Sequence, residues 1–291
     1  MYSNRLYSPL RYPGGKAKFA PFIARVMAEN GIEGGHYLEP YAGGAGVALD
    51  LLFHGHAQHV HINDADYAVY AFWVSVTEYY NELLDLLEAT PITIDEWFRW
   101  RKVLRGETES GIVEKGFATL FMNRTNRSGI LKAGVIGGKN QEGRYKLDAR
   151  FKKDVVAARI EEVAKRSDSI SVYHEDSWRL LARCSEFLPD RSLIYLDPPY
   201  YIKGKGLYRN YYNHDDHVAI ANALQDKRFR WPWVVSYDNT QEIRRMYEMS
   251  KSLCYSLNYT AQKRYMGSEV MFFSEDLAVP EDGVPKTRNV G

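Results

Sequence analysis

The segment "IYLDPPYY", from Ile194 to Tyr201, constrains the fold more than any other part of the sequence. An apolar strand runs directly into an acid and two prolines. Because proline cannot donate to a sheet ladder and forces the residue before it into an extended conformation, the strand must end there. Asp197 is therefore predicted to be held stiffly at the carboxyl end of a strand. Ligands of open α/β sheets bind at that edge, which makes Asp197 a candidate for chemistry.

Strand patterns alternate with helical patterns along most of the chain. The strand-like runs are "HYLE", "HVHIND", "ISVYHED", "SLIYLD", "WVVSYDN", "SLCYSLNY" and "EVMFFSE". Such alternation predicts an α/β fold with a mostly parallel sheet and right-handed crossovers. The last two runs follow each other too closely for a crossover helix. We therefore expect them to pair antiparallel, giving a seven-stranded sheet with an antiparallel edge strand.

The middle of the chain has a different pattern. Helical periodicity begins near Asp66, and Thr93 and Glu96 have the spacing of a capping box before a further helix. The run "NRTNRSGILKAGVIGGKNQEGRYK" is rich in glycine, asparagine and basic residues, which predicts an exposed loop or hairpin. The chain then returns to a helical pattern up to about residue 166.

These patterns predict a domain organisation. Residues 1–76 and 164–275 are expected to form one catalytic domain in two parts. Residues 77–163 are expected to form a mostly helical insertion that carries the basic loop. Residues 276–291 lack periodicity and are expected to form a loose tail.

The overall net charge of +1 conceals an uneven distribution. The segment from Arg99 to Lys153 contains 14 basic and 5 acidic side chains, so it carries +9 while the rest of the chain carries −8. Such a segment is typical of proteins that bind a polyanion, because neutralised phosphates release counterions. A solvated helical face rich in lysine is the alternative interpretation.

Other features indicate a soluble cytoplasmic protein without a metal. No run approaches the ~20 apolar residues of a membrane span, and the N-terminus has no apolar segment typical of secretion. The two cysteines, Cys184 and Cys254, are expected to be buried, inert thiols. Four histidines lie close together, but their spacing crosses a helix-to-strand connection, so we predict no metal site for the following residues: His54, His56, His59 and His61.

A glycine-rich turn follows the first strand run. In "YLEPYAGGAGVAL", Gly43, Gly44 and Gly46 separate a strand from a helix, so the backbone could approach a cofactor closely. About twenty residues later, Asp64 ends the next strand, at a separation typical of an acid that receives ribose hydroxyls. The nucleoside-triphosphate pattern G-x-x-x-x-G-K-[ST] and the strict G-x-G-x-x-G spacing are both absent. An ordinary tight turn stays an alternative at this point.

Four segments in order carry a family resemblance: "RYPGGK", "EPYAGGAG", the basic middle with "NRTNRSG" and "GRYK", and "LDPPY". Together they resemble the D12 class of adenine-specific DNA methyltransferases, over roughly Arg11 to Phe273, with the motif order of the α group. The resemblance implies a Rossmann-like methyltransferase fold, S-adenosylmethionine as cofactor and double-stranded DNA as partner. It also implies a monomer or weak dimer from a bacterium or phage, and allows a cognate restriction endonuclease in the same system.

The resemblance also implies roles for individual residues. The catalytic set is Asp197, Pro198 and Tyr200. The set expected to contact the cofactor is Tyr12, Lys16, Glu39, Tyr41, Gly43, Gly44, Asp64, Asp176 and Asp197. The set expected to contact DNA is Arg124, Asn126, Arg127, Arg144 and Lys146. The sequence departs from the family in the glycine turn, where Ala45 occupies a position at which glycine is common.

The family chemistry would explain why an acid, two prolines and two aromatic residues follow a strand. If Asp197 and the carbonyl of Pro198 each accept one hydrogen of an adenine amino group, the nitrogen lone pair is freed for attack. The base would have to be flipped out of the duplex and could stack on Tyr200. An RNA N6-adenine methyltransferase, a cytosine-N4 methyltransferase and a catalytically idle DNA-binding protein with this fold are the alternatives.

Overall fold

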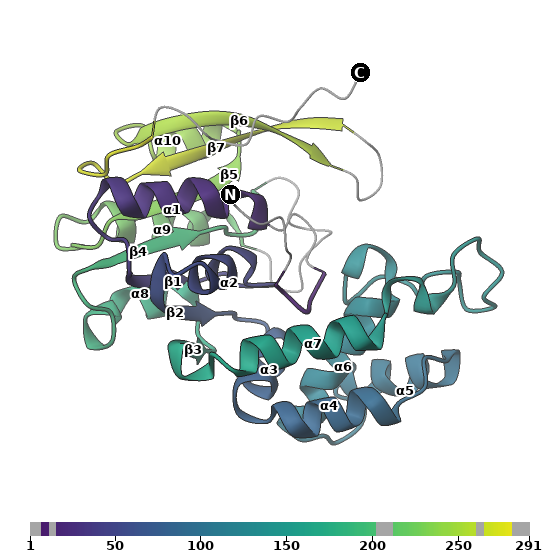
Figure 1. The fold of residues 1–291 in the computed structure, drawn as a ribbon. Coiled ribbons are helices and arrows are strands. Elements are labelled where there is room, and N and C mark those ends of the chain that lie inside the picture. Colours follow the sequence, from purple (N-terminus) through teal and green to yellow (C-terminus); the bar gives the residue numbers. More distant parts are fainter. Residues whose placement is uncertain (1–6, 12–15, 202–211, 260–264, 281–291) are drawn as a thin grey trace.

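The computed structural model describes residues 7–11, 16–201, 212–259 and 265–280. In these residues the chain forms an α/β fold around a seven-stranded sheet of order β3-β2-β1-β4-β5-β7-β6 (Figure 1). This confirms the predicted Rossmann-like methyltransferase fold. The strands are β1 (Gly35–Glu39), β2 (Ala57–Asn63), β3 (Ile170–Tyr173), β4 (Ser192–Leu196), β5 (Trp233–Asp238), β6 (Lys251–Tyr259) and β7 (Tyr265–Phe273).

Helices cover the sheet and build a separate group beside it. They are α1 (Ala20–Glu29), α2 (Gly46–Phe53), α3 (Tyr67–Glu78), α4 (Tyr80–Ala89), α5 (Ile94–Arg105), α6 (Ile112–Thr125), α7 (Lys153–Ala164), α8 (Ser177–Ala182), α9 (His214–Gln225) and α10 (Gln241–Met246). A short 3₁₀ helix, η1 (Ala17–Phe19), precedes α1. Thr93 caps α5 by accepting a hydrogen bond from the Glu96 amide, as its spacing predicts. The pattern that begins at Asp66 forms two helices, since the backbone leaves the helical conformation at Tyr79.

The strand pairing defines the edge at which a ligand would bind. β1 is parallel to both β2 and β4, β2 is parallel to β3, and β4 is parallel to β5. β7 is antiparallel to β5 and to β6, so the antiparallel strand is one position in from the edge and β6 is outermost. Because the chain leaves β1 toward β2 on one side and reaches β4 on the other, a crevice is expected at the carboxyl ends of β1 and β4.

The alternation of side chains in the central strands separates two apolar layers. In β4, Leu193 and Tyr195 belong to the core under α1, α2 and α3, whereas Ile194 and Leu196 belong to the core under α8, α9 and α10. All five residues of β4 are buried. A strand covered on both faces reads as a continuous apolar run, which is why "SLIYL" has no polar alternation.

The helical insertion shares its core with one face of the sheet. Helices α3 to α7 form a group beside the sheet, at the lower right of Figure 1. The apolar core on that face continues without interruption into the insertion through Trp73 of α3, Trp97 of α5 and Phe117 of α6. α3 contacts α4, α6 and α7. The domain boundary expected between residues 76 and 77 therefore does not coincide with a break in the apolar core.

Two expectations differ from the structure. The first residues of the predicted loose tail are packed, because Leu277 is buried and the amide of Ala278 donates to Asn30 Oδ1 over 2.8 Å. Residues 281–291 lie outside the described residues. Cys184 is buried, and burial raises the pKa of its thiol to about 12. Cys254 is exposed, because it lies on the outermost strand, β6.

No helix within the described ranges is both long enough and apolar enough to cross a lipid bilayer.

The contact between α3 and α6 yields a stability prediction. A Cβ at Gly116 would lie 2.2 Å from the Ser75 hydroxyl oxygen and 2.7 Å from the carbonyl oxygen of Ala71. We expect Gly116→Ala to lower the free energy of unfolding by about 2 kcal/mol, since the overpacking outweighs the better helix propensity of alanine. Urea unfolding monitored by circular dichroism would measure it.

The double variant Ser75→Ala/Gly116→Ala is the matched control. It removes the hydroxyl contact but leaves the carbonyl contact, so only part of the stability should return. A Gly116→Ala protein as stable as the wild type would show that the two helices are not packed this closely.

Candidate active site

Four acids lie at the carboxyl edge of four neighbouring strands. Asp176, Asp64, Glu39 and Asp197 follow or end β3, β2, β1 and β4, and these strands are adjacent in that order. Asp176 is exposed, Asp64 and Asp197 are partly exposed, and Glu39 is buried. Sequence analysis predicted each of the four as a site residue, and the sheet order brings them to one edge.

Asn63 fixes the ends of these strands relative to one another. Its side-chain amide donates to the carbonyl oxygens of Pro40 (2.9 Å) and Glu175 (3.0 Å), and its Oδ1 accepts from the Glu175 amide over 2.9 Å. Ser177, at the start of α8, also donates to the Pro40 carbonyl over 3.2 Å. The segments that follow β1, β2 and β3 are therefore held together by one buried side chain.

The glycine turn is held from two sides. Gly43 donates its amide hydrogen to Asp64 Oδ2 over 3.0 Å, and its carbonyl accepts from the indole of Trp73 over 2.9 Å. Ala45 adopts φ 47°, in the left-handed region that favours glycine. Alanine therefore keeps the turn geometry at this position, at some cost in backbone strain. The predicted strand, glycine turn and helix are all present.

Burial changes the acid strength of two carboxyl groups beside this turn. Burial raises the pKa of Asp64 to about 7, although the amides of Asp66 and Gly43 hydrogen-bond its oxygens and oppose the change. Burial raises the pKa of Glu39 well above its usual range, against the hydrogen bond it accepts from the Ala48 amide in α2. Both groups therefore bind protons more readily than exposed acids do.

Asp197 has one engaged oxygen and one open oxygen. Its Oδ1 accepts a hydrogen bond from Ser236 of β5 over 2.7 Å and lies 3.4 Å from Lys16 Nζ. Within the described residues, no hydrogen bond or ion pair involves its Oδ2. Burial raises the pKa of Asp197, and Lys16 acts in the opposite direction. The carboxylate is thus oriented through one oxygen while the other can accept.

Lys16 is buried between two carboxylates. Its Nζ lies 2.6 Å from Glu269 Oε2, closer than the 3.4 Å to Asp197. Burial alone would lower the pKa of Lys16, but Asp197 and Glu269 outweigh it and raise that pKa. η1, which directly follows Lys16, packs against the glycine turn, where a Cβ on Gly46 would lie 3.0 Å from the Cβ of Ala17. The close approach brings Lys16 to the edge of the sheet.

Tyr200 is held by Glu269, the acid that lies closest to Lys16. Its ring is buried, and its hydroxyl donates to Glu269 Oε1 over 2.9 Å. Tyr255 donates to Glu269 Oε2 over 2.7 Å. Glu269, Tyr255 and Ser236 are not among the residues that the sequence patterns predicted for the site. An acid inside the apolar run "EVMFF" was the one signal that could have pointed to Glu269, because an acid in a buried strand needs partners.

The other residues expected to contact the cofactor have varied positions. Tyr41 follows β1 and donates to the hydroxyl of Tyr212 over 3.1 Å. Gly44 is buried within the glycine turn, and Pro198 is buried directly after Asp197. Tyr12 lies outside the described residues.

Two residues expected to contact DNA, Arg124 and Asn126, have buried side chains in this structure. Arg124 is buried and donates to the carbonyl oxygens of Pro9 and Arg150, and burial lowers the pKa of its guanidinium to about 10. Asn126 is fully buried, and its Oδ1 accepts from the Trp97 indole over 2.7 Å. Arg124 thus ties the N-terminal segment to α6, whereas Asn126 ties the start of the basic loop to α5.

The N-terminal segment is attached to the insertion by further contacts. Asn123 of α6 exchanges two hydrogen bonds with the backbone of Arg11, over 2.7 and 2.9 Å. Arg159 of α7 donates to the Ser8 carbonyl over 3.0 Å. Residues 8–11 therefore lie on α6 and α7, five positions or more before Lys16.

Three residues expected to contact DNA are exposed. Arg127 follows α6, beside an isolated antiparallel bridge between Asn126 and Val135. Arg144 and Lys146 are exposed beside Tyr145, whose ring centroid lies 5.6 Å from the Arg144 guanidinium. All three side chains face solvent, although Lys146 Nζ also donates to the carbonyl oxygen of Gln141.

The histidines are engaged with one another and with neighbouring strands. His36 Nδ1 lies 2.9 Å from His61 Nε2, and His61 Nδ1 lies 3.0 Å from the Tyr173 hydroxyl. Burial lowers the pKa of His61 to about 3, so the ring is neutral at pH 7. Across the described residues, no group of three or more histidine, cysteine, aspartate or glutamate side chains is arranged to hold a metal ion.

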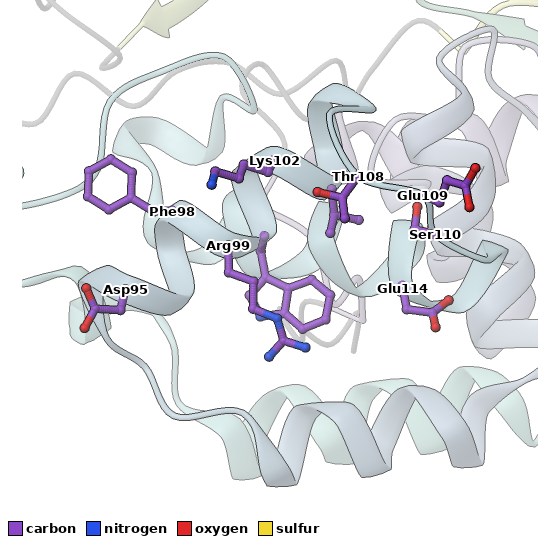
Figure 2. A pocket seen from close by; sticks show the side chains of 10 residues that line it. Asp95, Phe98, Arg99, Lys102, Thr108, Glu109, Ser110 and Glu114 are labelled. Carbon is purple, nitrogen blue, oxygen red and sulfur yellow. The ribbon is translucent and has the colours of Figure 1, made fainter.

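A pocket of about 460 Å³ lies in the helical insertion, between α5 and the segment that leads into α6 (Figure 2). Arg99 and Lys102 line it together with Asp95, Glu109 and Glu114. The mixture of charges matches neither a phosphate nor a cation. None of the four edge acids lines this pocket, so it is separate from the candidate active site.

Comparisons with known proteins complete the description. No curated protein matched the sequence. Among solved structures, a candidate RNA methyltransferase from Pyrococcus horikoshii is 12% identical with a TM-score of 0.41, covering 91% of this chain and 83% of that chain. Protein LPL1258 from Legionella pneumophila is 16% identical with a TM-score of 0.34, covering 90% and 85%. Both TM-scores are too low to inform the function.

The family comparison is more informative. The profile described as D12 class N6 adenine-specific DNA methyltransferase matches residues 12–265, which include the glycine turn, the basic insertion and the Asp197 segment. The chain therefore belongs to the D12 class of N6 adenine-specific DNA methyltransferases.

Proposed function

We propose that this protein transfers a methyl group from S-adenosylmethionine to N6 of an adenine flipped out of duplex DNA. One observation carries the proposal. Asp197 is oriented at the sheet edge through Oδ1, while Oδ2 has no partner among the described residues. An acceptor prepared in this way, followed directly by the Pro198 carbonyl, suits an exocyclic amino group with two hydrogens.

The carboxyl edge fits the proposed cofactor. S-adenosylmethionine, when bound, supplies an electrophilic methyl group on a positively charged sulfur. The buried group of Lys16, Asp197 and Glu269 carries a net charge of −1 when all three are ionised, which favours a cation nearby. Asp64, directly after β2, would receive the ribose hydroxyls. Glu39, Tyr41, Gly43, Gly44 and Asp176 surround the same edge and would complete the site.

The residues around Asp197 account for the chemical step. If Asp197 Oδ2 and the Pro198 carbonyl each accept one N6 hydrogen, the amino group is drawn toward tetrahedral geometry and its lone pair points at the methyl carbon. The new N–C bond forms as the C–S bond breaks, and one N6 proton is then released. Catalysis of this kind is positioning together with stabilisation of the positive charge that develops on N6.

Two further features support a flipped base. Extrusion of a base costs a few kcal/mol, and stacking on an aromatic ring offsets part of that cost. The Tyr200 ring is held by its hydroxyl bond to Glu269 and lies two residues after Pro198 in the chain. Arg127, Arg144 and Lys146 provide exposed positive charge for the DNA backbone.

The first prediction tests the function in a cell. A methylation-free bacterial host that expresses this chain should acquire N6-methyladenine at one short sequence motif, detected by long-read sequencing of its genome. Asp197→Ala should abolish the mark, because the loss of a positioned acceptor costs about 10³-fold in rate. Binding of S-adenosylmethionine, measured by calorimetry, should change little.

Asp190→Ala is the matched control, since Asp190 is an exposed acid just before the same strand. That variant should leave the mark intact. If a folded protein binds S-adenosylmethionine but marks only RNA, the DNA proposal is wrong. A mark on cytosine would reject N6 of adenine as the acceptor.

The second prediction concerns pH. Because burial raises the pKa of Asp64 to about 7, the group is largely protonated at pH 6 and largely ionised at pH 8. The ionised form accepts hydroxyl hydrogen bonds best, so affinity for S-adenosylmethionine should rise about tenfold from pH 6 to pH 8. Asp64→Asn should bind more weakly and lose this dependence in calorimetric titrations. An equal pH dependence in Asp64→Asn would contradict the role of Asp64.

The third prediction concerns DNA affinity. Arg144→Ala and Lys146→Ala should each weaken binding to any duplex and reduce the slope of log affinity against log salt by about 0.9. Fluorescence anisotropy with a labelled duplex would measure both effects. Arg228→Ala is the control, because Arg228 is also exposed but lies outside the basic segment, paired with Asp226. A slope that is unchanged in the first two variants would place the DNA elsewhere.

A further inference from the structure

We infer that Glu269 of β7 is a positioning residue for methyl transfer. Its carboxylate holds the Lys16 ammonium away from Asp197 and fixes the Tyr200 ring, so that Asp197 Oδ2 stays open to the target amino group. The inference rests on the proposed function. Glu269 makes hydrogen bonds with Lys16 and Tyr200, and these two side chains carry its effect to the site.

The distances show which carboxylate holds the lysine. Lys16 Nζ is 2.6 Å from Glu269 Oε2, a charge-assisted hydrogen bond, but 3.4 Å from Asp197 Oδ1. Lys16 is only 4% exposed, so water does not replace a lost partner easily. Without the negative charge on Glu269, Asp197 would be the remaining carboxylate beside the ammonium. The lysine would then move onto Asp197 and compete with the amino group of the base.

The second contact controls the aromatic ring. Glu269 Oε1 accepts the hydroxyl hydrogen of Tyr200 over 2.9 Å, which fixes the far end of that ring. Because Tyr200 comes three residues after Asp197, its ring and the acceptor oxygen are set by one short piece of chain. The Glu269 carboxylate thus helps to set the position of the Tyr200 ring, on which the base would stack, relative to Asp197, which would accept a hydrogen bond from N6.

The carboxylate is itself held in a single orientation. Glu269 is fully buried, and Tyr255 of the neighbouring strand donates to its Oε2 over 2.7 Å. In the sheet, Glu269 pairs with Asp238 of β5 on one side and with Tyr255 of β6 on the other. Partners on both oxygens and strands on both sides leave little freedom for the side chain to rotate.

The stability of the folded protein does not by itself explain why residue 269 is an acid. Taking an ion pair out of water costs about as much as the pair returns, and apolar replacements of buried pairs are often neutral or stabilising. A buried carboxylate that serves packing alone would be expensive. Two of the side chains that contact Glu269, Lys16 and Tyr200, instead have roles in the proposed reaction.

The test uses Glu269→Gln in the full chain, which keeps the size of the side chain and removes its charge. We expect kcat for methyl transfer from labelled S-adenosylmethionine to unmethylated genomic DNA to fall about 100-fold, because a displaced lysine and ring misplace the base. KM for DNA and Kd for S-adenosylmethionine should change much less. A loss confined to KM would overturn the inference.

Val270→Ala is the matched control. Val270 is the neighbouring residue on β7, but it is buried in the core on the opposite face of the sheet. The change should lower the thermal midpoint while kcat stays near the wild-type value. If both variants lose kcat in proportion to their loss of stability, the effect of Glu269 is only structural and the inference is wrong.

A crystal structure of Glu269→Gln gives a readout that does not need activity. Lys16 Nζ should approach Asp197 to about 2.8 Å, the length of a charge-assisted hydrogen bond, and the Tyr200 ring should turn. Unmoved Lys16 and Tyr200 side chains would overturn the inference. If the wild type transfers no methyl group to DNA, the proposed function fails, whereas this structure still decides whether Glu269 sets the position of Lys16.

Discussion

The buried charge of Lys16 is the interaction on which the candidate site depends. An ammonium group at 4% exposure is stable only if carboxylates replace the water it has lost, and here they come from two separate strands, β4 and β7. Lys16 thereby connects three parts of the structure: the N-terminal segment, the end of β4 at Asp197, and the antiparallel strand β7. The acceptor geometry of Asp197 follows, because its Oδ1 is directed toward Lys16 and Ser236.

A second set of contacts relates the sheet edge to the helical insertion. Trp73 lies on α3, and its indole supports the carbonyl of Gly43 in the glycine turn. The same helix packs against α6, where Gly116 permits close contact. The turn expected to lie beside the cofactor and the helices that carry the basic loop therefore share one rigid element. This arrangement suits an enzyme whose two substrates must be aligned to within fractions of an ångström.

The sequence was sufficient for the fold and for the edge acids, because both follow from local rules. The prolines after Asp197 stop the strand, and parallel strands bring their carboxyl ends to one edge. Asp64 and Asp197 could therefore be predicted to lie at that edge. Residue type did not reveal which side chains of the basic segment would be buried. Arg124 and Asn126 resemble DNA-reading side chains, but their partners are backbone and indole groups that only the tertiary fold brings near.

Glu269 could not be assigned for a related reason. Its partners are 253, 69 and 14 positions away in the chain, and no spacing rule connects them. The antiparallel pairing of β7 was predictable, yet the register that sets Glu269 opposite Tyr255 was not. Polar contacts between residues far apart in the chain are the part of a site that is hardest to predict from a single sequence.

The attachment of residues 8–11 to α6 and α7 has a consequence for protein engineering. Arg124, Asn123 and Arg159 hold the backbone that leads into Lys16. In a chimera that took only the helical insertion from a relative, the three side chains that bind residues 8–11 would be replaced. The exchanged part would have to include residues 8–11 together with the helical insertion. It would therefore consist of two segments that are far apart in the sequence.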